Sequence, residues 1–524
     1  MNKTPLYFLF LSLSLFILGI LFQGCNKLNV LQKGVNYYLD SENGADSNNG
    51  LSPATAWKSI NKIKDIQFNP GDSLLLCRGS VFEGVIDIFA HGKPENRIVI
   101  DAYGQGPKPC IKAPDNSLYT ICIKNSDYVT LQNLEIVNTG LERKPMRTGV
   151  KVMCENYGTS RNIILNALYI HDVNGSLVKA EGGGSGILID NRWDNDSMIS
   201  VFDSLTIENC VIRRCERNAI IWNAPWSRKN WHLSTHTVVR RNLIEEVPGD
   251  GIVPIGCDGA LVEYNLMRNC PALLPDTEAA AGIWPWSCDN TIIQFNEVSD
   301  HKAPWDAQGF DSDYNCTNTT IQYNFSHDND GGFILICNSG ESDPAHNIGN
   351  IGSIIRYNIS INDAVRQRKT RVGIFSPTIH IAGPCRNTLI EHNILHVGEK
   401  PSNKVDRKVV TSDSWGGHAD STIFKDNLFF VQQPSAFNLT QSTNNHFMGN
   451  YYIGEFSNKP VDKQIRNLSS SYYSSLVGNA TDASLMLPSF FREEVVGDGA
   501  AFIRVINKEV IREFFNKMES DTNI

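Results

Sequence analysis

Two aspartates, Asp311 and Asp313, stand two residues apart in a short segment that alternates between apolar and polar residues. In a β-strand, residues two apart point to the same side, and their Cα atoms lie roughly 6.5–7 Å apart. Two carboxylates at that spacing disfavour each other's ionisation, so one can keep its proton while the other is charged. Such a pair can cleave a glycosidic bond by general acid catalysis combined with base or nucleophilic catalysis. Asp306, shortly before the pair, is a third candidate for this chemistry.

Tryptophan and further polar residues surround the pair in the sequence. Trp284 and Trp286 occupy alternate positions of the preceding repeat, and Trp305 directly precedes Asp306. Indole rings stack against the apolar C–H faces of sugar rings, which predicts a role in substrate binding for these residues. The same role is predicted for four residues in nearby repeats and loops, namely Asp250, Glu278, His327 and Trp222.

Other roles compete for the same side chains. Aspartate beside glycine, as at Asp250, is often only a turn former. A single histidine such as His327 is more often structural than catalytic, and a tryptophan can pack beneath a loop. Asp311 and Asp313 could instead bind Ca²⁺, a hard cation that prefers carboxylate oxygens. No other metal site is predicted.

A repeated strand pattern must position these candidates. Two or three apolar or β-branched residues, one or two polar residues and then Asn recur nine times. The asparagines are Asn166, Asn209, Asn242, Asn265, Asn296, Asn324, Asn358, Asn393 and Asn427. From Asn242 onward the steps range from 23 residues (Asn242 to Asn265) to 35 residues (Asn358 to Asn393). Short alternating runs bounded by turn residues, repeated in this way, predict a solenoid of stacked β-strands.

Asparagine suits the corner between two strands, because it adopts left-handed geometry and hydrogen-bonds to neighbouring backbone. Stacked in successive coils, such amides form a ladder. A second phrase, a small residue followed by an alternating strand, includes Gly251–Ile255, Gly282–Trp286 and Gly309–Asp313. The large apolar residue after each glycine should point inward, so the tryptophan pair and the aspartate pair should point outward on one face.

This pattern resembles right-handed parallel β-helix proteins of the pectate-lyase-like superfamily, which contains polysaccharide lyases and glycoside hydrolases. The segments Tyr37–Asp40, Asn48–Trp57, Asn69–Asp72 and Arg78–Phe82 look like the entry of many Bacteroidetes β-helix carbohydrate-active proteins. The paired aspartates resemble those of β-helical glycoside hydrolases of the polygalacturonase and lacto-N-biosidase types. The resemblance covers about residues 35 to 450 and implies fold and carbohydrate context, whereas one fold hosts many reactions.

The first 25 residues predict export. Lys3 precedes an apolar run from Leu6 to Phe22, as in a secretory signal. The ending Leu21–Cys25 resembles a bacterial lipobox, in which Cys25 is acylated and becomes the mature N-terminus. We therefore expect a lipoprotein of the cell envelope, held at the outer membrane by its acyl chains on the periplasmic or surface face.

The net charge and the cysteine content limit which partners and metal sites the sequence predicts. The net charge of −9 offers no basic surplus for a nucleic-acid backbone, so a carbohydrate substrate and the membrane are the predicted partners. Of the thirteen cysteines, the twelve after Cys25 form no CxxC pair and adjoin apolar runs. We expect them to be small buried side chains rather than metal ligands.

The predicted architecture is all-β and single-domain. It has a signal peptide over residues 1–24 and a β-helix over 25–450, with an N-terminal cap at about 35–80. The last coils and a C-terminal cap fill residues 451–524, and Val505 to Met518 should form an amphipathic helix over the open end of the stack.

Three functions fit this sequence. The first is a glycoside hydrolase that acts on a polysaccharide or oligosaccharide through the paired aspartates, with no cofactor. The second is a Ca²⁺-dependent lyase of a uronic-acid glycan, for which Lys151, Lys302, His327, Arg366 and Arg368 are possible parts, although the two arginines, with Lys369 and Arg371 after them, fit a solvated basic loop better. The third is a non-catalytic glycan-binding surface lipoprotein. The concentration of carboxylates and tryptophans favours the hydrolase.

Overall fold

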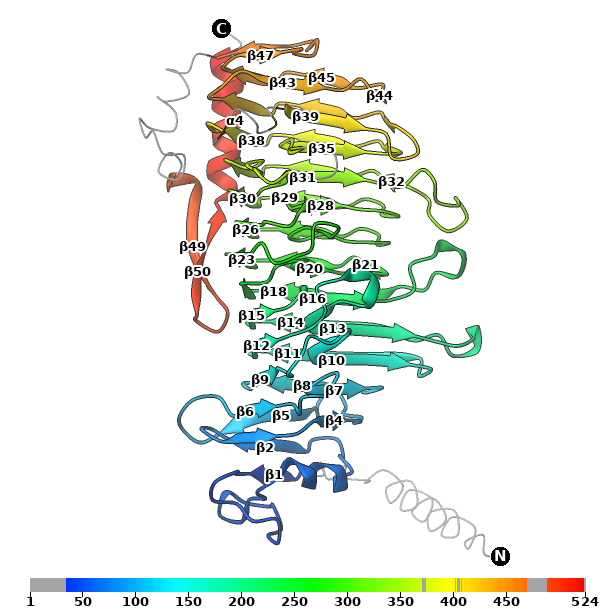
Figure 1. The fold of residues 1–524 in the computed structure, drawn as a ribbon, viewed down its shortest axis with the longest axis vertical. Coiled ribbons are helices and arrows are strands. Elements are labelled where there is room, and N and C mark those ends of the chain that lie inside the picture. The colour runs from blue at the N-terminus through cyan, green and yellow to red at the C-terminus, as the bar shows by residue number, and fades with distance from the viewer. Residues whose placement is uncertain are drawn as a thin grey trace, which may run out of the picture.

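The computed structural model describes residues 34–369, 374–400, 402, 406, 408–468 and 488–522. Its body is a parallel β-helix, as predicted: the coils stack into a long column, and most coils contribute a strand to each of three parallel sheets (Figure 1). The signal segment and Cys25 lie outside the described residues.

The longest sheet, sheet A, holds sixteen strands, and its strands carry the apolar part of the Asn phrase. Its strands are β1 (Asn36–Leu39), β2 (Ser73–Cys77), β5 (Ile98–Tyr103), β8 (Val129–Gln132), β11 (Thr159–Asn166), β14 (Val201–Glu208), β17 (Ser234–Thr235), β18 (Val238–Arg240), β21 (Cys257–Asp258), β22 (Leu261–Glu263), β25 (Ile292–Gln294), β29 (Thr320–Gln322), β33 (Ile354–Arg356), β37 (Leu389–Glu391), β41 (Ile423–Lys425) and β45 (His446–Met448).

Sheet B follows sheet A around each coil and has fourteen strands. They are β3 (Val81–Glu83), β6 (Cys110–Lys112), β9 (Glu135–Asn138), β12 (Tyr169–Val173), β15 (Val211–Cys215), β19 (Leu243–Glu245), β23 (Leu266–Arg268), β26 (Glu297–Ser299), β30 (Phe325–His327), β34 (Ile359–Ile361), β38 (Ile394–Val397), β42 (Leu428–Val431), β46 (Tyr451–Ile453) and β48 (Arg466–Asn467).

Sheet C is divided into two six-stranded parts. The N-terminal part is β4 (Ile86–Ile88), β7 (Ile121–Lys124), β10 (Arg147–Glu155), β13 (Gly184–Arg192), β16 (Asn218–Asn223) and β20 (Ile252–Val253). The C-terminal part is β28 (Gln308–Ser312), β31 (Gly332–Cys337), β35 (Ile379–Ala382), β39 (Lys408–Asp413), β43 (Ser435–Asn438) and β47 (Phe456–Ser457). Between them, Gly282–Trp286 hydrogen-bonds to both neighbouring coils but forms only isolated bridges, at Ile283 and Trp286, and Pro285 has no N–H to donate.

Shorter elements lie in the loops between the three sheets. The short strands are β24 (Ala279–Ala280), β27 (Trp305–Asp306), β32 (Asn350–Ile351), β36 (Cys385–Arg386), β40 (Ala419–Asp420) and β44 (Ser442–Thr443). The 3₁₀ turns are η1 (Pro53–Thr55), η2 (Ile60–Asp65), η3 (Lys179–Glu181), η4 (Asp196–Met198), η5 (Arg228–Asn230) and η6 (Pro488–Phe490).

The predicted asparagine ladder forms the corner between sheets A and B. From Asn242 each side-chain amide donates to the carbonyl oxygen of the next ladder asparagine at 2.9–3.1 Å, as far as Asn450, which donates to Asp462. These asparagines are fully buried. The ladder thus satisfies polar groups that would otherwise be costly in the core.

Two details of the ladder differ from the sequence prediction. Asn166 and Asn209 are out of register, because the place of Asn242 in the preceding coil is taken by Cys210. The left-handed residue is also the one before each ladder asparagine, for example Tyr264 with φ 57° and Phe295 with φ 58°. Aromatic rings at this position stack from coil to coil, with centroids 5.0–5.4 Å apart. This stacking offsets the steric cost of left-handed geometry in bulky residues.

The C-terminal elements cover the flank of the column rather than its open end. The antiparallel hairpin of β49 (Phe491–Val496) and β50 (Ala501–Ile506) leads into helix α4 (Lys508–Thr522), which runs along the column (Figure 1). Phe514, Phe515 and Met518 pack against side chains of sheet B and the aromatic corner. The helix was predicted correctly, but its start at Val505 and its place over the open end were wrong. The outer surface of sheet B is apolar here and needs the cover.

The interior consists of stacked isoleucine, leucine and valine side chains, with cysteines among them. All twelve cysteines after Cys25 are free thiols, and all but the half-buried Cys77 are buried, as predicted. Strands β1 and β2 already pair with sheet A, so much of the segment predicted as an N-terminal cap belongs to the stack. No helix in the described part of the chain is long and apolar enough to cross a membrane.

Candidate active site

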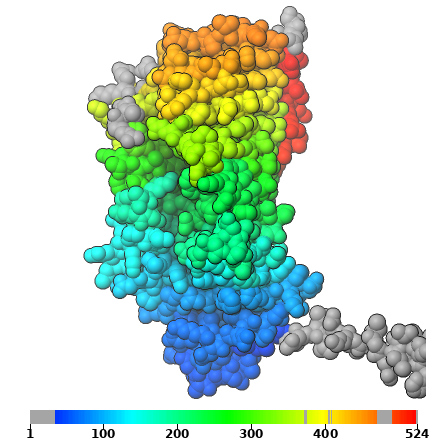
Figure 2. Space-filling view, turned by 90° about the vertical axis from the view of Figure 1, so that its right-hand side faces the viewer, coloured from blue at the N-terminus to red at the C-terminus, as the bar shows by residue number. Residues whose placement is uncertain are grey.

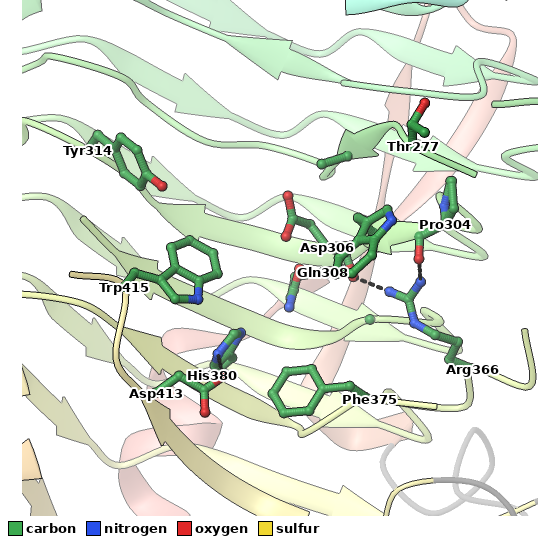
Figure 3. Close-up of a pocket in the computed structure, with 13 residues that line it drawn as sticks. Thr277, Pro304, Asp306, Gln308, Tyr314, Arg366, Phe375, His380, Asp413 and Trp415 are labelled. Atoms are coloured by element: carbon green, nitrogen blue, oxygen red, sulfur yellow. Dashed lines mark hydrogen bonds and ion pairs between the residues drawn. The ribbon is translucent and has the colours of Figure 1, made fainter. Parts of the chain in front are cut away.

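A cavity of about 560 Å³ opens on the outer side of sheet C, close to the break between its two parts. Figure 2 shows the surface hollowed at the level of the central, green coils. The cavity walls come from loops and strands of several coils, and the lining residues are Thr277, Ala279, Pro304, Trp305, Asp306, Gln308, Tyr314, Gly331, Arg366, Phe375, His380, Asp413 and Trp415 (Figure 3).

Asp306 is the predicted catalytic residue that lines this cavity directly. Its backbone and that of Ala307 are both left-handed, with φ values of 56° and 62°, which is strained for residues with a side chain. The turn is held by pairing of β27 with β24 and by a close approach of Gly331, where a Cβ would lie 1.6 Å from the Asp306 carbonyl oxygen. Only glycine fits at that position.

Arg366 also stabilises the turn at Asp306 and Ala307. Its buried guanidinium donates to the carbonyl oxygens of Ala303, Pro304 and Asp306 (Figure 3). The interpretation of Arg366 as part of a solvated basic loop was wrong, because its side chain is buried. Arg368 is partly exposed and pairs with Asp276, and Lys369 is exposed. A buried cation bound to three carbonyl groups fixes the main chain that carries Asp306.

Asp311 and Asp313 lie where the sequence predicted, on the outer side of β28 and just after it. Asp311 is 3% exposed, and its Oδ1 atom has no hydrogen-bond partner within the described structure. Asp313 stays partly exposed, next to the cavity-lining Tyr314, and its Oδ1 lies 3.1 Å from the Cys337 sulfur.

Burial and mutual repulsion raise the pKa values of all three aspartates. Burial raises the pKa of Asp311 well above its usual range, and the charges of Asp306 and Asp313 raise it further. Burial raises the pKa of Asp313 to about 6. Burial also raises the pKa of Asp306, although the neighbouring His380, Lys179 and Arg366 oppose that rise. Burial and neighbouring carboxylates therefore favour the protonated form at this site, as is required of a carboxyl group that acts as a general acid.

The far wall of the cavity contains residues that the sequence reading missed. His380 donates from Nε2 to the Asp413 carboxylate at 2.9 Å, and its ring packs edge-on against Phe375 and Trp415. His380 lies in the same row of sheet C as Asp311, two strands further along. Extending the outward positions of β28 to later coils would have found it.

Three predicted substrate-binding residues instead form a buried network beneath the cavity. Asp250 pairs with Arg217 at 2.8 Å and accepts from the Trp284 indole N–H at 3.1 Å. Glu278 pairs with Arg217 at 3.1 Å and accepts from the Lys179 backbone N–H at 2.8 Å. All four side chains are buried, so the prediction that Asp250, Glu278 and Trp284 contact substrate was wrong. Their hydrogen bonds hold the loops that form the cavity wall.

Two further predictions were wrong because the residues face other parts of the molecule. Trp222 is 2% exposed and belongs to the apolar core. His327 lies on sheet B, where Glu297 and Arg504 of the C-terminal hairpin contact it. Burial opposes its charge, but hydrogen bonds to Asp328 and Glu297 outweigh that effect and raise the pKa of His327 to about 9.

The two remaining predicted tryptophans, Trp305 and Trp286, have different surroundings. Trp305 lines it and donates its indole N–H to the Asp276 carbonyl oxygen at 2.8 Å. Trp286 is covered by Trp226, whose ring stacks on it at 5.8 Å and is itself 41% exposed. Roles of Trp305 and Trp286 in substrate binding stay predictions.

The described residues contain no group of three or more His, Cys, Asp or Glu side chains arranged to hold a metal ion. The alternative that Asp311 and Asp313 bind Ca²⁺ stays a prediction. The raised pKa values of both carboxyl groups favour their neutral forms, which bind a cation less well.

Comparison with known proteins adds one curated relative and a related crystal structure. No protein-family model matches the chain. The sequence is 26% identical over 581 aligned positions to the lacto-N-biosidase of Bifidobacterium longum subsp. longum, covering 92% of this chain and 34% of that protein. The chain thus spans about a third of the length of this relative. The crystal structure of the GH136 lacto-N-biosidase from Eubacterium ramulus superposes with a TM-score of 0.57 at 23% identity, over 82% of this chain and 67% of that one. Its selenomethionine derivative gives the same TM-score over 84% and 68%. This similarity confirms the parallel β-helix fold.

Proposed function

We propose that the protein is a glycoside hydrolase that acts on an oligosaccharide through Asp306 and Asp313. The observation that carries the proposal is a cavity with aromatic walls that is lined by the partly exposed Asp306. The partly exposed Asp313 lies next to the lining residue Tyr314, and the buried Asp311 interacts with both carboxyl groups. The similarity to two proteins named lacto-N-biosidases, which are glycosidases, supports the reaction class and suggests a lacto-N-biose unit as the first substrate to test.

The two carboxyl groups have different environments, which suggests a division of labour. Asp313, with a pKa of about 6, holds a proton in mildly acidic solution and can donate it to the leaving glycosidic oxygen. Asp306 faces His380, Lys179 and Arg366, which favour its carboxylate form, so it is the candidate base or nucleophile. Asp311, buried beside both, is expected to stay protonated and so to add no further repulsion.

A lyase has less support from the structure. Removal of a proton beside a uronate carboxyl group requires charge neutralisation by a cation or a metal ion. Among the described residues that line the cavity, Arg366 is the one lysine or arginine, and its guanidinium is occupied by three carbonyl oxygens. A neutral sugar fits this arrangement better than an acidic one.

The test is hydrolysis of an aryl lacto-N-bioside by the purified mature protein, measured through the release of the aryl alcohol. We expect turnover that survives EDTA and falls as pH rises above about 6, because Asp313 then loses its proton. Turnover that EDTA abolishes would move the aspartates to a calcium-binding role. Retained glycan binding with no turnover on a wider panel of oligosaccharides would favour a non-catalytic binding protein.

We also propose that the protein is an outer-membrane lipoprotein anchored through Cys25, on the strength of its signal-like start and the lipobox-like Leu21–Cys25. In expressing cells, Cys25→Ala should abolish incorporation of labelled palmitate and shift the protein out of the membrane fraction. Unchanged labelling in the variant would contradict the anchor.

A further inference from the structure

We propose that the outer face of sheet C carries a second carbohydrate-binding site on strands β4 to β13, and that it takes a neutral sugar. A separate cavity of about 500 Å³ lies there and shares no lining residue with the candidate active site. It belongs to the coils drawn in cyan in Figure 1, whereas the active-site aspartates lie in the green coils. A volume of this size is typical of pockets that bind small molecules.

An exposed aromatic ring forms one edge of this cavity. Phe89 directly follows β4 and is 63% exposed. Its ring packs edge-on against His91 at 4.9 Å, and His91 in turn stacks on Tyr157 at 5.8 Å. The Phe89 ring is therefore held in place although most of its surface meets solvent. A fixed, exposed aromatic face beside polar groups is suited to the apolar face of a sugar ring.

Charged side chains on the floor of the cavity are paired across neighbouring coils. Lys124 lies 2.7 Å from Glu155, and Arg192 lies 2.9 Å from the other oxygen of Glu155. Lys151 lies 2.7 Å from the buried Asp190. Each pair joins neighbouring strands, β7 with β10 or β10 with β13, and Glu155 is held from both sides.

The remaining polar groups complete a neutral site. Asp87 accepts a hydrogen bond from the Tyr119 hydroxyl at 2.9 Å. Three cations and three carboxylates are therefore balanced around the cavity. A ligand with a net charge would have to disrupt one of these pairs, whereas sugar hydroxyl groups can donate to the carboxylate oxygens and accept from the ammonium and guanidinium groups. The chemistry thus favours an uncharged, hydroxyl-rich ligand over an acidic one.

This site goes beyond the proposed catalytic function and does not depend on it. A second sugar-binding surface on the same face of the column would hold a long or branched glycan while one of its ends occupies the active site. The resulting gain in affinity comes from a higher effective concentration of the second sugar. It therefore appears with substrates large enough to reach both sites and not with small ones.

The test uses ligand-observed NMR with lacto-N-tetraose as the probe. In the full-length mature protein, Asp306→Asn prevents turnover, and Trp415→Ala weakens binding in the active-site cavity because it removes an aromatic wall. We expect residual saturation transfer in this double variant, and an at least fivefold loss of it when Phe89→Ala is added. The matched control is Phe502→Ala, since Phe502 is 64% exposed but lies on the C-terminal hairpin.

The outcomes separate this site from the catalytic proposal. Equal residual transfer in the Phe89→Ala and Phe502→Ala proteins, or no transfer in the double variant, would overturn the second site. Phe89→Ala alone should leave turnover of the aryl glycoside within twofold of the wild type, and a greater loss would place Phe89 in the active site instead. A wild-type protein that hydrolyses nothing refutes the catalytic proposal but leaves the binding test intact.

Discussion

The corner between sheets A and B and the outer face of sheet C are built on different principles. At the corner, one asparagine per coil repeats in register from Asn242 to Asn450, and each is buried and fully hydrogen-bonded. On sheet C the regular strands are interrupted between β20 and β28, where Gly282–Trp286 hydrogen-bonds to both neighbouring coils but forms only isolated bridges. The candidate active site lies beside this interruption. Regular stacking at the corner provides rigidity, and the interrupted face provides room for loops that carry functional groups.

Strain is distributed differently in the two regions. Left-handed residues at the corner, such as Tyr264 and Phe295, are supported by the same stacking in every coil. The left-handed pair Asp306–Ala307 is supported by a single arginine and a single glycine. Substitutions at the corner should therefore lower stability and leave activity largely intact. Substitutions on the outer face of sheet C should lower activity and leave stability largely intact.

The largest effect is expected from the candidate catalytic pair. Asp306→Asn or Asp313→Asn should lower kcat/KM at least ~10³-fold, because each removes a proton-transfer or nucleophilic group, while thermal stability is kept or raised by the loss of repulsion. Asp420→Asn, on the short strand β40 away from the cavity, is the control and should retain activity. Full activity in both active-site variants would contradict the assignment.

A smaller loss of activity is expected from Arg366→Met, which removes the clamp on the Asp306 turn. The expected fall in kcat is about 10²-fold, a typical cost of misplacing a catalytic group. Because Arg366 also lowers the pKa of Asp306, the acidic limb of the pH–rate profile should move to higher pH. The neighbouring Arg368→Met is the matched control. If both variants lose activity equally with no change in the pH profile, the role of Arg366 is only structural.

The reverse pattern is expected at the corner. Asn324→Ala removes a buried amide that donates to Ile293 and Asn358 and accepts from Asn296, so it should lower the free energy of unfolding by about 2–4 kcal/mol. Activity at a temperature well below the transition should stay within a few-fold of wild type. The exposed Asn116→Ala is the control, because Asn116 is not left-handed, and denaturant unfolding measures both variants. A loss of less than 0.5 kcal/mol, roughly the size of a surface substitution, would show that the ladder contributes little.

The smallest effect concerns pH and a buried histidine of sheet B. Burial lowers the pKa of His396 from 6.5 to about 4, and neither ring nitrogen has a hydrogen-bond partner in the described structure. The unfolded chain therefore takes up the proton first, and stability is lost as pH falls from about 6.5 toward 4. His396→Leu should flatten this part of the Tm–pH curve, whereas the exposed His446→Leu should leave it unchanged. Identical curves in all three proteins would contradict the assignment.

The corner between sheets A and B could be predicted from the sequence, because one residue type, asparagine, recurs there in almost every coil. The active site was only partly readable. Asp306, Asp311 and Asp313 were found from their spacing, and the alternation of β28 gave the outward direction of the last two correctly. Asp250, Glu278 and Trp284 were misread because Arg217, distant in sequence, draws them beneath the cavity. Trp222 was misread although its own strand alternation already pointed it inward. His380 could have been found by following the row of Asp311 into later coils, whereas the role of Arg366 depends on contacts with a distant loop that its own segment does not predict.

The most direct test of the central claim is the fate of solvent oxygen during turnover. Cleavage of the lacto-N-bioside is carried out in H₂¹⁸O, and the sugar product is analysed by mass spectrometry. Our account predicts a saturated disaccharide that carries one ¹⁸O atom, formed by the wild type and lost in Asp306→Asn and Asp313→Asn. An unsaturated product without ¹⁸O, or labelled product formed equally well by both variants, would contradict it.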